Sequence, residues 1–351
     1  MNGASALPRL IVMISSALVA TAGWACAQET PRAPNGKADL TGTWTSLSLT
    51  PLERPDSQPK LVISREEADK LEGRVATGRT QAAQRTDPKA PAPPKTSNPG
   101  GYNDFWLDPG DRYSVVKGEI RTSGIVEPVN GKIPYRDRLA STVVQRQISQ
   151  EYASGKGDYQ GPEDIPLRER CLIGFGNTGG PGMLGSVYNN TYQFVQTEHH
   201  MVMLIEMVHD ARIIPIFASA REARAAHRPN AITPWLGDSV GWWEGDTFVM
   251  ETINVNPIQA SESSIPLTKD GKMVERFTRV GNGEIFYEFE VTDPNHYTQP
   301  WKAEYTLTVP KGRVYEYACH EGNYAMLGIL GGARLAERKA AQIAVRGSPA
   351  Q

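Results

Sequence analysis

The chain has 351 residues, with 37 lysines and arginines against 39 aspartates and glutamates and a formal charge of −2. Its cationic side chains are scattered among acids and form no basic patch, which argues against a nucleic-acid-binding protein. After the N-terminal segment, no run of residues is apolar enough to cross a membrane. We therefore expect neither a nucleic-acid partner nor a membrane span.

Residues 1–27 have the features of a secretory signal peptide. Arg9 precedes an apolar run that ends at Trp24, and Ala25-Cys26-Ala27 is a small-x-small cleavage pattern. The alternative is a lipoprotein acylated at Cys26, but the bulky ring of Trp24 lies where a small residue is wanted. We expect cleavage near Ala27 and a periplasmic or secreted protein.

Two cysteines, Cys171 and Cys319, remain after that cleavage. In an oxidising compartment such a pair is most simply one disulfide bond. The long loop that it closes would stabilise the fold by roughly 4–5 kcal/mol in the chain-entropy model. The alternative interpretation makes Cys319, beside His320, a nucleophile or a metal ligand.

The first part of the mature chain, residues 28–101, is expected to be an N-terminal extension. Gly42-x-Trp44 ahead of a strand weakly resembles the opening of lipocalin-type barrels. Ser64 is the predicted N-cap of a short helix that runs to about Leu71. Residues 79–101 are rich in proline and poor in apolar residues, which predicts a linker or a surface excursion.

Residues 102–351 are expected to form a single β-rich domain. The pattern predicts strands over 117–126 and 131–135 and a helix over 136–152. The glycine-rich run 174–182 lacks the Lys-Ser/Thr of a phosphate-binding P-loop, so nucleotide binding is not expected. Further strands are predicted over 191–196, 201–208 and 212–217.

The second half of the domain is a series of predicted hairpins. Residues 240–243 and 247–255 flank one turn, and residues 274–280 and 285–291 flank Gly281-Asn282-Gly283. Residues 301–309 alternate apolar and polar side chains, a strand follows over 314–319, and residues 323–341 form a final helix. We predict a mainly β fold, an antiparallel meander that closes into a lipocalin-like or calycin-like barrel or packs as a sandwich.

The segment from Trp235 to Thr247 resembles a large family of uncharacterised exported bacterial proteins. These share W-x-G-D-S-x-G-x-W-E-G-D-T and a later A-C-H-E-G-N-Y, present here from Ala318 to Tyr324. The resemblance covers most of the mature chain and implies export, but no activity. This chain departs from the pattern at Glu251, where Asp is usual, and in a longer segment 218–228. Further matching stretches are 102–106, 121–123, 170–172, 188–190 and 206–212.

Three polar clusters interrupt the β-forming sequence. In the first, Glu206, His209 and Arg212 form either a structural ion pair or a ligand site, in which Arg212 binds an anion and Glu206 or His209 moves a proton. Whether Glu206 and Arg212 share a face depends on where the chain turns.

The second cluster contains Asp238 and Ser239, and the third is His320 with its neighbour Glu321. Gly-Asp238-Ser239 is similar to the opening of some serine hydrolases, but its late position among hairpins does not fit that fold. The simpler interpretation is that Asp238 and Ser239 form hydrogen bonds to a loop. His320 either lies at a strand end or acts as an acid or base at a barrel mouth. The histidine spacings do not match a zinc site, so no metal is expected.

We therefore expect a periplasmic enzyme that acts by acid–base chemistry, as a lyase, isomerase or hydrolase, on a small, partly apolar or aromatic molecule. No organic cofactor is implied. The alternatives are a non-catalytic, lipocalin-like carrier and a structural envelope protein. The catalytic candidates are Glu206, His209, Asp238 and His320, and the substrate-binding candidates are Arg212, Trp243 and Tyr287.

Overall fold

The computed structural model describes residues 30–83, 89, 107–154, 157 and 159–347. The expected signal peptide and most of the expected proline-rich linker lie outside these residues. No helix among them combines the length and apolar character needed to cross a membrane.

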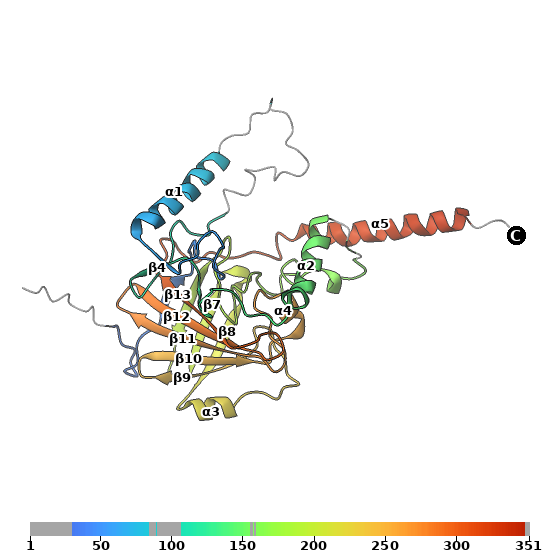
Figure 1. Ribbon diagram of the computed structural model, residues 1–351. Coiled ribbons are helices and arrows are strands. Elements are labelled where there is room, and N and C mark those ends of the chain that lie inside the picture. Colours follow the sequence, from blue (N-terminus) through green and yellow to red (C-terminus); the bar gives the residue numbers. More distant parts are fainter. Residues whose placement is uncertain (1–29, 84–88, 90–106, 155–156, 158, 348–351) are drawn as a thin grey trace, which may run out of the picture.

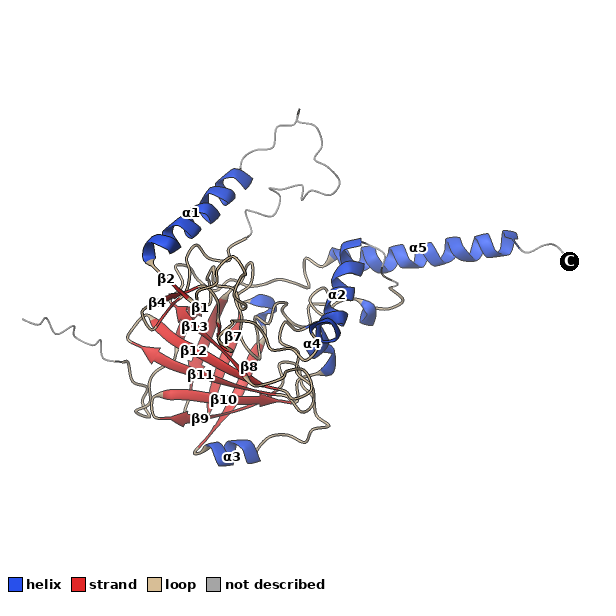
Figure 2. Ribbon diagram, in the orientation of Figure 1, coloured by secondary structure: helices blue, strands red, loops and turns tan. Residues whose placement is uncertain are grey.

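Nine strands of the described chain form a closed barrel, which confirms the mainly β fold and selects the barrel over the sandwich (Figure 2). Thr45 of the first strand pairs with Thr308 of the last and closes the ring. A further strand, β5 (Ile125–Glu127), pairs with the start of β13, on the edge whose far end pairs with β1. The barrel strands are, in order around the ring, β1 (Gly42–Thr45), β6 (Thr191–Gln196), β7 (His200–Ile205), β8 (Ala211–Phe217), β9 (Asp238–Glu244), β10 (Thr247–Ile253), β11 (Lys272–Val280), β12 (Glu284–Thr292) and β13 (Trp301–Thr308).

The hairpin strands form where apolar and polar residues alternate along the sequence. Side chains alternate between buried and solvent-facing along β12 and much of β13, as they must where one face packs on a core. The buried face carries large rings that stack on one another across strands, including Phe277 on Tyr287 at 4.8 Å. Burial of this aromatic surface stabilises the barrel.

One strand pair differs from the predicted meander, because β8 and β9 are parallel. Parallel neighbours need a crossover, and residues 218–237 provide it with helix α3 (Ala220–Ala225). Ala223 of α3 packs on Val240, Trp242 and Val249 on the outer face of the sheet. This crossover gives the barrel a second small core outside the ring.

The segment 28–101 contributes β1 to the ring, so part of the expected extension belongs to the barrel itself. Helix α1 (Arg65–Ala82) starts at the predicted cap, where Ser64 and Glu67 form a capping box. It runs past Leu71, and Arg79 in its last turn donates to the carbonyl of Gly110 at 2.6 Å. A small sheet lies beside α1, formed by β2 (Val62–Ile63), β3 (Val115–Val116) and β4 (Glu119–Arg121).

Other predicted elements are shortened or absent. The strand expected over 117–126 is divided between β4 and β5, and residues 131–135 make only an isolated bridge from Tyr135 to Tyr297. The helices are α2 (Arg138–Ser154), α4 (Pro257–Glu262), the short 3₁₀ helices η1 (Pro162–Asp164) and η2 (Met207–His209), and α5 (Tyr324–Gly347). Figure 1 shows α1 and α5 extending away from the barrel.

Residues 309–323, which we call the strap, connect β13 to α5 and contain no helix or strand, although a strand was predicted over 314–319. The strap is tied to the rest of the fold by the disulfide bond between Cys171 and Cys319, whose Cα atoms are 5.8 Å apart. This confirms the predicted pairing. It also explains why the strap needs no partner strand, because a covalent bond fixes its far end.

Replacing both cysteines, as Cys171→Ser with Cys319→Ser, should lower the free energy of unfolding. The bond joins positions 148 residues apart, and the chain-entropy model assigns such a loop about 4–5 kcal/mol. Chemical denaturation of the parent protein with and without a thiol reductant measures this free energy. The double variant is the control, because a reductant cannot change its stability. Equal stability of the oxidised protein and the variant would contradict the expectation.

Candidate functional site

A cavity of about 680 Å³ lies outside the barrel, over the seam where β1 meets β13. Leu307 points into the core, so its neighbours Thr306 and Thr308 point outward and form the floor of this cavity. The segment 108–115 covers it on one side, where Thr306 donates to the carbonyl of Val115 at 2.7 Å. The strap covers it on another side. We call this space the seam cavity.

Glu206 is the buried acid of the seam cavity, at 7% exposure. It follows the last residue of β7, and its carboxylate accepts hydrogen bonds from the backbone N–H of Thr191 at 3.2 Å and of Tyr315 at 3.4 Å. The second bond fixes the strap against the barrel. Glu206 therefore has both a structural role and a place in the cavity wall.

His209 also holds the strap. The chain turns sharply after Glu206 through η2, where Val208 and His209 have φ values of 58° and 46°. This turn exposes His209 and places its Nδ1 at 3.1 Å from the carbonyl oxygen of Tyr317. His320, one residue after the disulfide, is exposed on the strap. Neither histidine lines the seam cavity.

Arg212 lies inside the barrel and pairs with Glu275 rather than with Glu206. The two side chains are 2% and 0% exposed, and the guanidinium makes two hydrogen bonds to the carboxylate, at 2.7 and 3.2 Å. Arg212 also donates to Ser239 and Thr252. The expected ion pair between Glu206 and Arg212 is therefore not formed, because both terminal nitrogens of the proposed anion-binding arginine are bonded to other groups, with Glu275 as the ion-pair partner; its buried Nε has no hydrogen-bond partner among the described residues.

Tyr287 completes this interior network. Its hydroxyl donates to Glu275 at 2.7 Å and accepts from the backbone N–H of Met183 at 2.7 Å. Burial, with the charge and hydrogen bond of Glu275, raises the pKa of Tyr287 well above its usual value, so it remains a donor. The glycine-rich loop closes over the network, and a Cβ at Gly180 would lie 2.7 Å from Nη1 of Arg212. Only glycine fits there.

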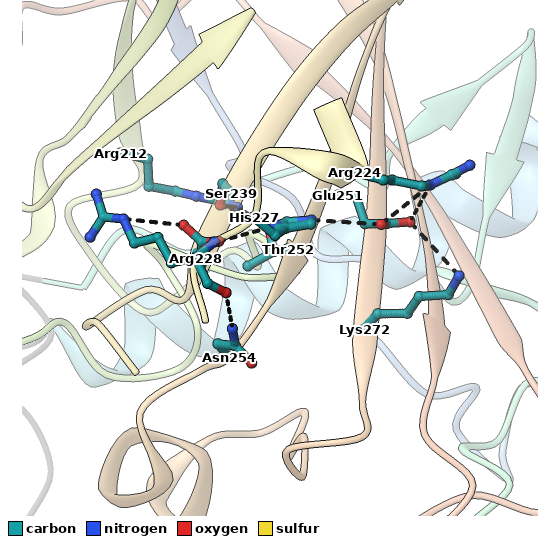
Figure 3. A network of polar contacts seen from close by, with 10 residues as sticks. Arg212, Arg224, His227, Arg228, Ser239, Glu251, Thr252, Asn254 and Lys272 are labelled. Atoms are coloured by element: carbon teal, nitrogen blue, oxygen red, sulfur yellow. Dashed lines mark hydrogen bonds and ion pairs between the residues drawn. The ribbon is translucent and has the colours of Figure 1, made fainter. Parts of the chain in front are cut away.

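Asp238, the first residue of β9, belongs to a third location: its neighbour Ser239 bonds Arg212 inside the barrel, so Asp238 points to the outer face. Figure 3 shows its partners His227 and Arg228. Its carboxylate accepts from Nδ1 of His227 and from the backbone N–H of Arg228, each at 2.8 Å. The other ring nitrogen of His227 faces Glu251 at 3.6 Å, and Glu251 also binds Arg224 at 3.1 Å. This network fastens the crossover to β9 and β10.

His227 cannot act as a base in this arrangement, because both ring nitrogens face carboxylates. Burial opposes its charged form most strongly, but the bonds and charges of Glu251 and Asp238 together outweigh burial and raise its pKa. Glu251 and the segment 218–228 lie against each other here, because this segment supplies Arg224 and His227, and both side chains meet the glutamate.

The remaining predicted aromatic, Trp243, packs on Phe248 with ring centroids 5.4 Å apart. The structure thus brings Arg212 and Tyr287 together and uses Glu206 and His209 to hold one strap, whereas Asp238, His320 and Trp243 lie elsewhere. Among the described residues, no three His, Cys, Asp or Glu side chains are grouped as metal ligands.

Three groups were missed by the sequence analysis. Glu275 occupies an inward position of β11 between Met273 and Phe277, and a lone charge on an apolar face was the available signal. His227, the partner of Asp238, carried no such signal. Burial raises the pKa of Asp210 to about 6, although a bond from the N–H of Gly174 opposes the rise.

Comparison with protein-family models, with curated proteins and with solved structures finds no match to this chain.

Removing one partner of the interior pair should be more damaging than removing both. Glu275→Leu leaves the Arg212 charge buried and unpaired, which typically costs about 3–5 kcal/mol, whereas Arg212→Met with Glu275→Leu leaves no buried charge and should cost less, although Tyr287 loses its acceptor. Urea denaturation of both variants checks this order. A Glu275→Leu variant as stable as the double variant would show that the pair is not the constraint that we describe.

The network around His227 should make stability depend on pH. Because its folded-state pKa is raised above the usual 6.5, its stabilisation is present below that value and declines as pH rises through the folded-state pKa. The parent protein should therefore exceed His227→Gln in unfolding free energy by more at pH ~5.5 than at pH ~9. Denaturation at both pH values measures this. A difference that is constant or grows with pH contradicts the assignment.

Proposed function

We propose that the protein is an exported small-molecule-binding protein whose ligand lies in the seam cavity. The volume of about 680 Å³ falls within the range of ligand pockets, roughly 300–1,000 Å³. The walls combine apolar side chains, among them Leu47, Val115 and Val309, with polar side chains and with charged side chains of both signs. The cavity itself is the single observation on which this proposal depends.

Binding is favoured over catalysis by the residues of the wall. They include one buried acid, Glu206, and neither histidine nor cysteine. Acid–base catalysis usually needs a donor and an acceptor placed on either side of the substrate. The histidines that were expected to supply the second group, His209 and His320, lie outside the cavity.

An enzyme is the second candidate, and Glu206 is the observation that favours it. A carboxylate in a cavity wall can accept a proton from a bound molecule, and Lys311 and Arg313 in the same wall would stabilise a developing negative charge. The reaction classes remain those of a lyase, an isomerase or a hydrolase. Turnover of a bound compound that Glu206→Gln abolishes without preventing binding would distinguish the enzyme from the binder.

Filling the seam cavity should prevent ligand binding. Thr308→Phe places a ring in the cavity, and we expect it to weaken binding of the uncharged fluorescent dye Nile red by at least about tenfold. Lys302→Phe is the matched control, because Lys302 faces the same way on the same strand but lies outside the cavity. Fluorescence titration measures both. Equal affinity in the two variants would exclude the cavity as the dye site.

A further inference from the structure

Glu206 is a buried carboxylate without a cationic partner among the described residues. The arginine that could have paired with it, Arg212, is held by Glu275 inside the barrel. No ion pair to Glu206 occurs among the described side chains, although the residue is only 7% exposed. Buried carboxylates are usually paired, because desolvation without compensation is costly.

The hydrogen bonds that Glu206 does make leave acceptor capacity free. A carboxylate has about four lone-pair sites, and two are occupied here. The bonds from Thr191 and Tyr315 measure 3.2 and 3.4 Å, at or beyond the long end of the usual range. Since the carboxylate belongs to the cavity wall, a bound donor can reach it from the cavity side.

The other charged side chains of the seam cavity have a weaker influence on which ligand charge it prefers. The exposed charges of the rim carry both signs: Arg112, Lys311 and Arg313 are cationic, and Asp108, Asp111 and Glu284 are anionic. Arg79 also lines the cavity and is half-buried, and its guanidinium donates to the carbonyl of Gly110 at 2.6 Å. Interactions of exposed charges are worth about 0–1 kcal/mol because solvent screens them, whereas a desolvated charge interacts much more strongly. Glu206 is the one charged side chain of the described cavity wall that is buried, so it is the charge that a bound group meets with the least screening by solvent.

The remaining wall suits the apolar body of an organic cation. Leu47, Val115 and Val309 supply aliphatic surface, and Tyr113 and Tyr315 supply aromatic residues. Aromatic faces attract cations through the ring quadrupole. A carboxylate beside aromatic and aliphatic surface is complementary to an ammonium group on an apolar body.

We propose that the ligand of the seam cavity is a small organic amine, whose ammonium group donates to the carboxylate of Glu206 while its apolar body lies against the strap and the segment 108–115. This inference rests on the proposed function, because it names the ligand class of the same site. It assigns Glu206 as the residue that determines specificity.

Three probes that share a phenyl ring and differ in their polar group test the proposal. They are phenethylamine, phenethyl alcohol and phenylacetate, each titrated by calorimetry at neutral pH. Phenethylamine should bind at least about tenfold more tightly than the alcohol, and phenylacetate should bind most weakly. Glu206→Gln should remove the advantage of the amine while Nile red still binds. Glu284→Gln, which removes an exposed rim acid, is the matched control and should leave the advantage unchanged.

Salt provides a second measurement on the unaltered protein, in case Glu206→Gln does not fold. A buried contact is screened little, so the advantage of the amine should persist at high ionic strength. If the advantage of the amine disappears at high ionic strength, the exposed rim charges cause it, and the proposal is overturned. Equal binding of amine and alcohol, or tighter binding of phenylacetate, would overturn the amine assignment but leave the binding function standing. If no probe binds, and Thr308→Phe leaves the affinity for Nile red unchanged, the proposal that the seam cavity binds a small molecule is itself overturned.

Discussion

The ion pair between Arg212 and Glu275 is the constraint around which the barrel is organised. Two opposite charges with almost no solvent exposure are costly unless they are paired and hydrogen-bonded, and Tyr287 and the polar side chains of neighbouring strands add bonds to the pair, although Nε of Arg212 has no partner among the described residues. The glycine-rich loop that closes over the pair can approach only because Gly180 has no Cβ. The network thus links several strands to a loop and makes the barrel interior a packed core.

A filled interior moves the ligand space to the outside of the barrel. The seam between β1 and β13 is covered by the segment 108–115 and by the strap, which is fixed by Glu206, by His209 and by the disulfide bond. Arg212 is paired with Glu275 inside the barrel, and Glu206 has no ion pair among the described residues.

Local sequence patterns predicted the parts of the fold that depend on local physics. Hairpin strands followed from period two and from turns such as Gly281-Asn282-Gly283, and the start of α1 followed from the Ser64 cap. The parallel pairing of β8 with β9 was not predictable in this way, because it depends on how α3 packs on the outer face.

The candidate site was predicted less well, because its contacts join residues far apart in the sequence. Glu206 was identified, but the pairing of Arg212 with Glu275 spans 63 residues and no local pattern specifies it. The same holds for the strap, whose irregular path depends on a disulfide bond rather than on strand propensity. His227 meets Asp238 only because the crossover folds back onto β9.

A crystal structure of the protein soaked with phenethylamine tests the central claim most directly. The account predicts electron density for the amine in the seam cavity, with its nitrogen within hydrogen-bond distance of the Glu206 carboxylate. Well-defined density at another location, or a cavity closed by side chains of the protein itself, would contradict it.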